Sequence, residues 1–421
     1  MSYKINIKNI TNDSVYFFCF ITFLIPWISL FSLSGFEIRF FHISVFILLV
    51  KKLFFKSPNI KMSKQSIPLT FLFLLCFILF FVSIFWSNDI VSGFSLFFKN
   101  FIYFLSFLLL SDFFLREKDF FLIKIIKYSK WAIYAFIALN LFIYIAMGEL
   151  FFFNAIEGII FGDSSVSNYK YFIKIINFKF SDFTIKTWGD EGFHIPKFRN
   201  VFGISALIIY SILDYITNPS RYEKALKLFL IFLILFSQSR STLLIFSVIL
   251  FLKFALNKLS LKLLIFLLLT PIVVIIFMMF IDISVFNRFL DLAKDARIEM
   301  YINTIRNTLN HSLLGSGFGT KIESHDKLFY VHNFILAGVF SSGILGLFLT
   351  FFTVSELVVQ IYNRVKFSKR YKYCFIYGLP ILVLFRMMIG GNNGLPSFQD
   401  WFALSVFFTL LFINKEELKV Q

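Results

Sequence analysis

Apolar runs of membrane-spanning length, separated by short polar turns, constrain this chain more than any other feature. Of its 421 residues, 58% are hydrophobic and 15% are charged, whereas soluble domains average about 45–50% and about 25%. A helix needs about 20 apolar residues to cross a bilayer, and about 12 runs approach that length. The sequence therefore predicts an all-α polytopic membrane protein, a single integral membrane domain over residues 1–421.

The short loops assign an orientation to these helices. The predicted spans are 15–33, 40–53, 67–86, 94–110, 131–147, 201–216, 226–236, 243–255, 263–283, 331–354, 373–389 and 401–413. Lys and Arg gather in alternate loops, whereas the turn Ser87-Asn88-Asp89 has neither. Because basic loops stay in the cytoplasm, both termini are predicted to be cytoplasmic. This pattern accounts for the net charge of +17, and the absence of a basic arm argues against a nucleic-acid partner.

Two segments, 148–199 and 284–330, are too polar to span and are predicted to be large loops on the outer side of the membrane. In the second, apolar residues at helical spacing over Asp291–Leu309 predict an amphipathic helix at the membrane surface. Two short apolar runs flank the polar turn 237–242. They fit best if this turn is drawn into the bilayer, where it lines a cavity.

Three arginines are candidates for binding an anion on the outer side. Arg240 lies between the hydroxyls of Ser239 and Ser241, and a guanidinium beside hydroxyl donors suits phosphate oxygens. The alternative is an interfacial anchor. Arg297 and Arg306 lie on the predicted amphipathic helix, where solvated charges are the simpler interpretation.

His332, followed by Asn333, opens an apolar run at the outer side. A lone histidine is more often structural than catalytic, but neighbouring cations favour the neutral imidazole that a general base requires. His194, His311 and His325 could join it at a zinc site. Their spacing matches no zinc motif, so the sequence predicts neither a metal nor a cofactor.

The remaining polar and special residues carry weaker signals. Gly315-Ser316-Gly317-Phe318-Gly319 lacks the strand–turn–helix context of a nucleotide loop and predicts a tight turn packed against the next span. Lys99 and Arg386 lie in or near predicted spans, where a charged residue is by default a candidate for function. For Arg386, snorkelling to the interface is the alternative. Cysteines 19, 76 and 374 are expected to be small buried residues. The outer carboxylates are too many to single out one; they include Glu157, Asp163, Asp190, Glu191 and Asp326.

In the order of its motifs the chain resembles the O-antigen polymerase and O-antigen ligase superfamily, the Wzy-type and WaaL-type bacterial membrane proteins. The matching pieces are Ser239-Arg240-Ser241-Thr242, an early loop arginine at Arg297, the glycine-rich segment 311–319, His332-Asn333, and Gly343-Ile344-Leu345-Gly346. Ser312 stands where the family usually has proline. A looser match places Arg199 before a helix containing Gly203.

The resemblance implies a metal-independent glycosyltransferase of the bacterial inner membrane. Its donor would be an undecaprenyl-diphosphate-linked oligosaccharide held in the periplasmic leaflet. Arg240 and Arg297 would clamp the diphosphate, and His332 would activate the acceptor hydroxyl. Further substrate contacts are expected from Arg306, Ser239, Ser241, Asn333 and Arg199.

Three functions stay open at this point. A polymerase would use a second lipid-linked repeat unit as acceptor, and a chain-length regulator protein would be a candidate partner. A ligase would use lipid A–core instead. A flippase for the same lipid-linked oligosaccharide would explain the spans, but it would not need an outer histidine near two arginines. The long loop 148–199 could hold a specific glycan, which favours the polymerase.

Overall fold

The computed structural model describes most of the chain and divides it into two compact units. The described residues are 7–24, 29–33, 36–54, 59–147, 170–171, 179–180, 183–184, 193–215, 219–236, 240–256, 296–310, 313–324, 327–367, 378–389 and 394–420. Unit 1 consists of Met1–Ile60, Arg116–Phe246 and Ser260–Phe286; unit 2 consists of Lys61–Leu115, Ser247–Leu259 and Asn287–Gln421.

The described part is helical apart from short two-stranded ribbons. Among the described residues, three helical stretches are long and apolar enough to cross a membrane: Ile67–Trp86, Ile90–Arg116 and Phe334–Ile361. Shorter apolar helices cover Gly203–Asp214, Thr242–Phe251, Gly378–Met388 and Phe398–Ile413. The chain is thus a helical membrane protein, while the number of spans and their orientation stay predictions.

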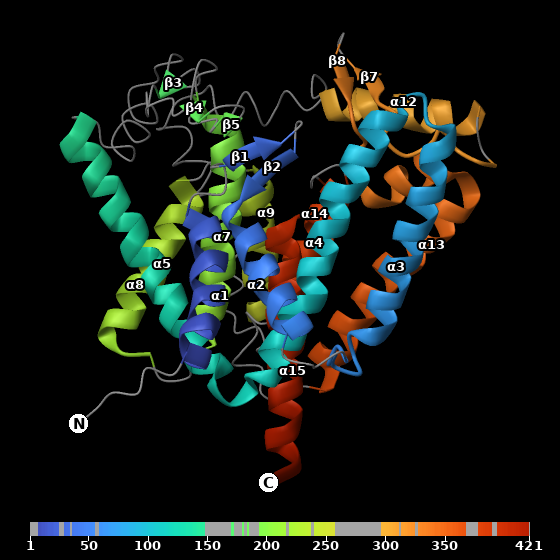
Figure 1. Cartoon of the computed structure of the whole chain (residues 1–421). Helices are drawn as coiled ribbons and strands as arrows, with labels where there is room; N and C mark the ends of the chain where they lie inside the picture. The colour runs from blue at the N-terminus through green and yellow to red at the C-terminus, as the bar shows by residue number, and fades with distance from the viewer. Residues whose placement is uncertain are drawn as a thin grey trace. The chain divides into compact units, whose positions relative to one another are not determined.

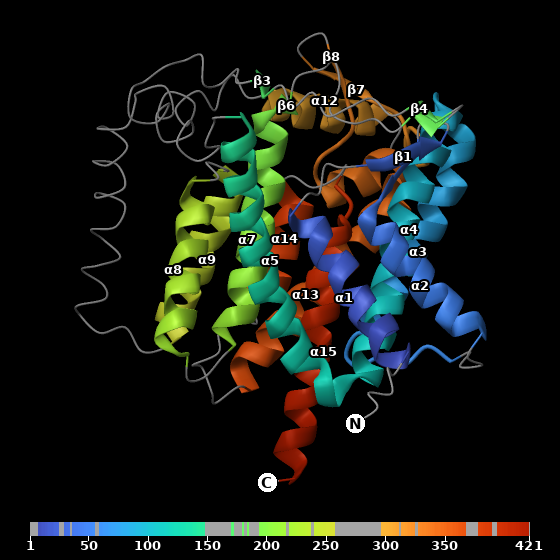
Figure 2. The ribbon, with the colours of Figure 1, turned by 60° about the vertical axis from the view of Figure 1, so that its left-hand side comes forward.

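Unit 1 contains the N-terminal helices and the helices around α7. Its elements are α1 (Ile7–Leu24), β1 (Ser29–Leu33), β2 (Phe36–Arg39), α2 (Phe40–Phe54), α5 (Lys118–Met147), β3 (Lys170–Tyr171), β4 (Lys179–Phe180), β5 (Phe183–Thr184), β6 (Phe193–His194), α7 (Ile195–Asp214), α8 (Arg221–Phe236) and the part of α9 (Arg240–Leu256) up to Phe246. Strands pair antiparallel as β1–β2, β3–β6 and β4–β5. Figure 2 shows α5, α8 and α9 around α7, where the rings of Tyr210 and Phe246 meet edge to face.

The predicted first span, 15–33, is wrong in its second half. Helix α1 ends at Leu24, and Ser29–Leu33 instead pairs with β2 in a hairpin. Pro26 follows two residues after the helix end. Proline cannot donate the hydrogen bond that continues a helix, so an apolar run across it does not guarantee one.

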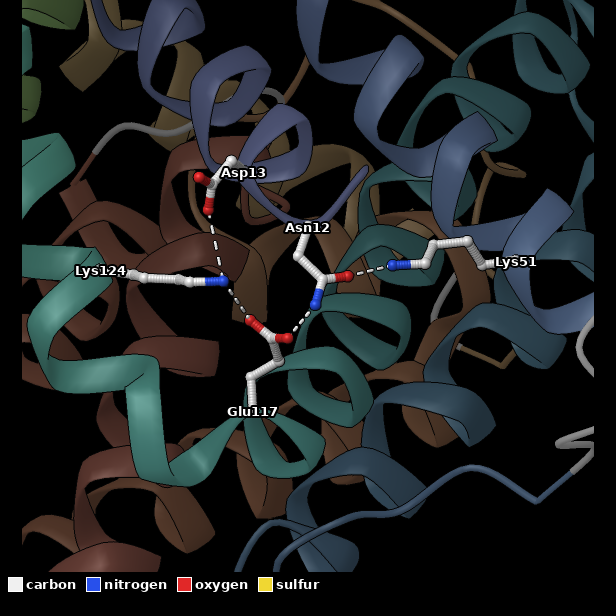
Figure 3. A network of polar contacts seen from close by, with 5 residues as sticks. All are labelled: Asn12, Asp13, Lys51, Glu117 and Lys124. Atoms are coloured by element: carbon white, nitrogen blue, oxygen red, sulfur yellow. Dashed lines mark hydrogen bonds and ion pairs between the residues drawn. The ribbon is translucent and has the colours of Figure 1, made fainter. Parts of the chain in front are cut away.

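A polar network fastens α1 to α2 and to the start of α5 (Figure 3). Asn12 Nδ2 donates to Glu117 Oε1, and Lys51 Nζ donates to Asn12 Oδ1. Lys124 Nζ lies 3.0 Å from Glu117 Oε2 and 3.3 Å from Asp13 Oδ1. Lys51 and Lys124 lie at two loops that were predicted to be on the same, cytoplasmic side. Their contacts with one network show that unit 1 has both loops at the same end of its helices.

The start of α8 is capped by a reciprocal pair. The Glu223 N–H donates to Ser220 Oγ at 3.2 Å, and the Ser220 N–H donates to Glu223 Oε2 at 2.8 Å, which is a capping box. Lys130 also donates to Glu223, and these contacts hold the pKa of Glu223 below its usual range.

Unit 2 contains the three long apolar stretches. Its elements are α3 (Ile67–Ser83), the 3₁₀ turn η1 (Ile84–Trp86), α4 (Ile90–Arg116), α12 (Ala296–Asn310), β7 (Ile322–Ser324), β8 (Lys327–Phe329), α13 (Phe334–Phe367), α14 (Gly378–Ile389) and α15 (Phe398–Val420). Figure 1 shows α3 beside α13, with α12, β7 and β8 at one end of these helices. Trp401 of α15 is completely buried, and its ring lies 4.6 Å from that of Phe73 and 5.3 Å from that of Phe104.

The loops of unit 2 are sorted to two ends, as the hydropathy predicts. At one end, the Lys61 N–H donates to Asp112 Oδ1 at 2.6 Å, and Gln360 donates to the carbonyl of Gln65 at 3.0 Å. These residues flank basic loops predicted to be cytoplasmic. At the other end, the turn between α3 and α4 meets the segment 313–320, and both were predicted to be outside.

Helix α13 is not the single continuous span predicted over 331–354. Ser342 (φ −134°, ψ 17°) and Gly343 (φ 61°, ψ −146°) leave the helical conformation and divide it in two. At Gly346, an added Cβ would lie 2.0 Å from the carbonyl oxygen of Gly338. The two parts therefore pack backbone to backbone at these glycines, which is how small residues bring membrane helices together.

Removing the Glu117 carboxylate should loosen unit 1. Its side chain is only 14% exposed, and Glu117→Ala leaves two donors without this acceptor, a loss of about 2 kcal/mol. We expect the melting temperature in detergent to fall by several degrees. Asp119→Ala is the matched control, because Asp119 is an exposed carboxylate two residues further on, in the first turn of α5. An equal loss there would contradict the role of the network.

The predicted orientation can be tested with two cysteine variants on a cysteine-free background. Asn88 and Lys64 are both exposed, at opposite ends of α3. A membrane-impermeant maleimide added to spheroplasts should label Asn88→Cys at once and Lys64→Cys only after the membrane is opened. The reverse pattern would invert the topology.

Candidate functional site

The segment 313–320, which we name the glycine turn, satisfies backbone groups that the break in α13 leaves open. The Ser316 N–H donates to the carbonyl of Phe340 at 2.7 Å. The Gly317 N–H donates to the carbonyl of Ser341 at 3.0 Å. In an unbroken helix those carbonyls would bind the N–H groups four residues on. The glycine turn thus replaces intrahelical hydrogen bonds at the break.

The glycine turn also binds the connection between α3 and α4. The contacts run from Trp86 Nε1 to the Leu314 carbonyl (3.0 Å), from the Phe318 N–H to Ser83 Oγ (3.2 Å), and between the hydroxyls of Ser87 and Thr320 (3.1 Å). The ring of Phe318 stacks on Phe80 at 5.0 Å. The prediction of a turn packed against the next span is confirmed, and the sequence did not reveal the second partner.

Glycine is required in this turn by conformation and by space. Gly315, Gly317 and Gly319 all have positive φ, from 73° to 100°, which side chains with a Cβ rarely adopt. A Cβ on Gly317 would lie 2.4 Å from the Cα of Ser87, and one on Gly319 would lie 2.4 Å from the Cα of Gly93. The turn is therefore a packing element at the predicted outer end of unit 2.

Helix α12 confirms the helix predicted over Asp291–Leu309, beginning at Ala296, while its place at a membrane surface stays a prediction. It packs against β7 and α13, burying Met300 and Thr304. Two members of the predicted apolar face, Ile302 and Ile305, are 45% and 50% exposed. A face that is apolar and turned away from the protein suits a membrane surface. Arg306 is exposed on this helix.

His332 and Asn333 lie directly before α13, and His332 is half-buried. Asn333 caps two helices with one side chain. Its Oδ1 accepts from the Leu336 N–H at 3.0 Å, and its Nδ2 donates to the Met388 carbonyl at 2.8 Å. The amide has a second hydrogen and a second lone pair beyond these two bonds. The predicted contact with substrate is therefore compatible with both caps and stays a prediction.

The alternative that Arg386 snorkels is wrong. Its side chain is only 9% exposed, and Nε lies 2.8 Å from Oδ1 of Asp400, which is completely buried. Arg386 Nη2 also donates to Ser397 Oγ at 3.1 Å. An interior charge needs a partner. The signal was available: Asp400 opens the next apolar run, so a short connection brings it to the same end as Arg386.

The predicted arginines stand near the starts of helices. Arg240 is the first residue of α9, Arg297 the second of α12, and Arg199 the fifth of α7. Helix N-termini carry partial positive charge and open N–H groups, which favour anions. In unit 1, α7 and α9 both connect to α8 and begin at the same end, so Arg199 and Arg240 share that end.

The predicted site residues fall in both units of the chain. Arg199, Arg240 and Ser241 belong to unit 1, whereas Arg297, Arg306, His332 and Asn333 belong to unit 2. The convergence of Arg240 with His332 stays a prediction. Ser239, His311, His325 and the five outer carboxylates lie outside the described residues, as does Cys374. Cys19 and Cys76 are buried and free, as predicted. Within the described ranges, no group of three or more His, Cys, Asp or Glu could hold a metal ion.

Comparison with protein families places these motifs in one segment. Residues 225–351 match the family model described as O-Antigen ligase. This match covers less than half of the chain and supports the O-antigen polymerase and ligase superfamily. The O-antigen ligase segment runs from α8 through the glycine turn into the second part of α13, so it includes Arg240, Arg297 and His332. Such a domain implies a glycosyltransferase-type activity on lipid-linked polysaccharide in a membrane. No curated protein matches the chain significantly.

Gly317→Ala should prevent stable folding of unit 2. The strained φ costs about 1–3 kcal/mol, and the contact with Ser87 adds to this cost. We expect little monodisperse protein by size-exclusion chromatography in detergent. Ser316→Ala is the control, because Ser316 contributes backbone groups to the turn. Normal folding of Gly317→Ala would contradict the close approach.

Proposed function

We propose that this protein is an O-antigen or surface-polysaccharide polymerase of the bacterial inner membrane. It transfers glycan from an undecaprenyl-diphosphate-linked donor to a lipid-linked repeat unit at the periplasmic face. The observation that carries this proposal is the O-antigen ligase segment, in which two arginines at helix starts and a half-buried histidine occur together.

The reaction forms one glycosidic bond and breaks one bond to the diphosphate. The acceptor hydroxyl attacks the anomeric carbon, and undecaprenyl diphosphate leaves with the electron pair of the broken C–O bond. His332 takes the hydroxyl proton. Because the diphosphate itself is the leaving group, the transfer needs no nucleotide sugar and no ATP.

Arg240 and Arg297 bear the charge that develops on the leaving group. Oriented cations in a site that excludes water act strongly on such charge, and removing one donor typically costs about 100–1,000-fold in rate. Each of these arginines stands at the start of a helix, where open N–H groups also favour an anion. Arg199, Arg306, Ser239, Ser241 and Asn333 complete the substrate contacts, and a chain-length regulator is the proposed partner.

An O-antigen ligase is the second candidate, because the matching family model carries that description. It would use the same clamp and the same base but transfer finished polymer to lipid A–core. We favour the polymerase because the long predicted periplasmic loop 148–199 offers room to recognise a specific repeat unit.

A surface-polysaccharide gel of a complemented deletion strain tests the proposal. The deletion should leave single repeat units on lipid A–core, and wild type should restore a ladder. Arg240→Ala and His332→Ala, expressed at wild-type levels, should restore no ladder. The first removes a cation that stabilises the leaving group, and the second removes the proposed base. Lys321→Ala is the matched control, an exposed cation on the same predicted outer side.

The other outcomes are equally informative. Bare lipid A–core with intact polymer on the carrier lipid would identify a ligase. An unchanged ladder in the deletion strain would overturn the assignment to this pathway. If His332→Ala restores the ladder, His332 is not the base, and the result favours a flippase for lipid-linked oligosaccharide.

A further inference from the structure

The residue before α13 is hydrogen-bonded to the end of α14. The last four carbonyls of a helix lack intrahelical partners, and the Met388 carbonyl receives its hydrogen bond from Asn333. Gly394, after α14, packs on the same residue: an added Cβ there would lie 2.9 Å from the Asn333 carbonyl. Any shift of this end of α14 therefore moves Asn333, and His332 is the residue before it.

A buried ion pair fixes the end of α14. Arg386 lies two residues before Met388 and pairs with Asp400. Asp400 Oδ2 also accepts from the N–H and the hydroxyl of Ser397, both at 2.7 Å, so one carboxylate caps α15 and binds α14. The next residue, Trp401, is completely buried in the aromatic core. The chain of contacts thus leads from that core to His332.

The guanidinium of Arg386 is committed to this packing. Its Nε and Nη2 bind Asp400 and Ser397, so it is a poor candidate for holding substrate. Buried ion pairs add little net stability compared with an apolar pair, and their best-supported use is to specify one arrangement. An interior charge of this kind in a membrane segment is expected to serve function.

We propose that the Arg386–Asp400 pair is a positioning device that sets the place of His332 through Met388 and Asn333. The proposal rests on the proposed function, because there His332 receives the acceptor proton. Arg386, Asp400 and Asn333 act through another residue and take no part in bond formation in this account.

Asn333→Asp separates the link from ordinary folding. Aspartate caps a helix N-terminus as well as asparagine, so the cap of α13 is kept. It has no N–H to give to Met388, so only the tie to α14 is lost. Arg386→Lys is the second variant, because lysine keeps the charge but lacks the fork that reaches both Asp400 and Ser397. Asp112→Asn is the matched control, since it weakens a contact at the opposite end of unit 2.

The experiment uses the full-length protein in lipid nanodiscs with three measurements. Hydrogen exchange over residues 332–337 reports the tie, binding of undecaprenyl diphosphate reports the clamp, and transfer of repeat units extracted from the deletion strain reports turnover. Asn333→Asp and Arg386→Lys should raise the exchange rate and lower turnover by about tenfold each, as expected for one hydrogen bond. The affinity of Arg386→Lys for undecaprenyl diphosphate should stay within about twofold of wild type, because Arg386 contacts Asp400 and Ser397. Asp112→Asn should leave all three readings near wild type.

Unchanged exchange over 332–337 in both variants would overturn the proposal, whatever their activity. An equal loss of turnover in Asp112→Asn would overturn it too, because the effect would then be general destabilisation. If exchange rises while His332→Ala keeps full transfer, the coupling is upheld and the proposed role of His332 fails. The two failures are therefore distinguishable.

Discussion

The hydrogen bonds between the glycine turn and the broken helix α13 are the contacts on which the rest of unit 2 depends. A break inside a membrane helix exposes carbonyls that lipid cannot satisfy, at a cost of several kcal/mol each. The N–H groups of Ser316 and Gly317 meet that need. In doing so they fix the turn that joins α12 to the start of α13, and with it the segment that carries His332.

Hydropathy and local chemistry predicted much of this architecture. The extents of α2 and α3, the amphipathic helix α12 and the turn at Gly315–Gly319 all follow from composition and spacing within a few residues. The failures have local physical causes. Pro26 follows the end of α1 within an apolar run, and Gly343 adopts φ 61° inside another. Average hydropathy over a window does not register either break, so both runs are predicted as continuous helices.

The sequence proposed candidate site residues but not their packing partners. Motif order singled out Arg240, Arg297 and His332 as candidates, and their roles stay predictions. The contacts of Asn333 with Met388 and of Arg386 with Asp400 depend on which helices become neighbours. That information lies in packing between α13, α14 and α15, and no local pattern encodes it. The sequence points to Asp400 only if one assumes that the buried charge of Arg386 must have an acidic partner nearby.

The central claim is that Arg240 and Arg297 hold one diphosphate next to His332. The most direct test is a structure of the full-length protein in a nanodisc with undecaprenyl diphosphate bound. The account predicts both guanidiniums within hydrogen-bond distance of the diphosphate oxygens, and the imidazole of His332 facing the same cavity from the periplasmic side. A diphosphate bound elsewhere, or a His332 that faces lipid, would contradict it.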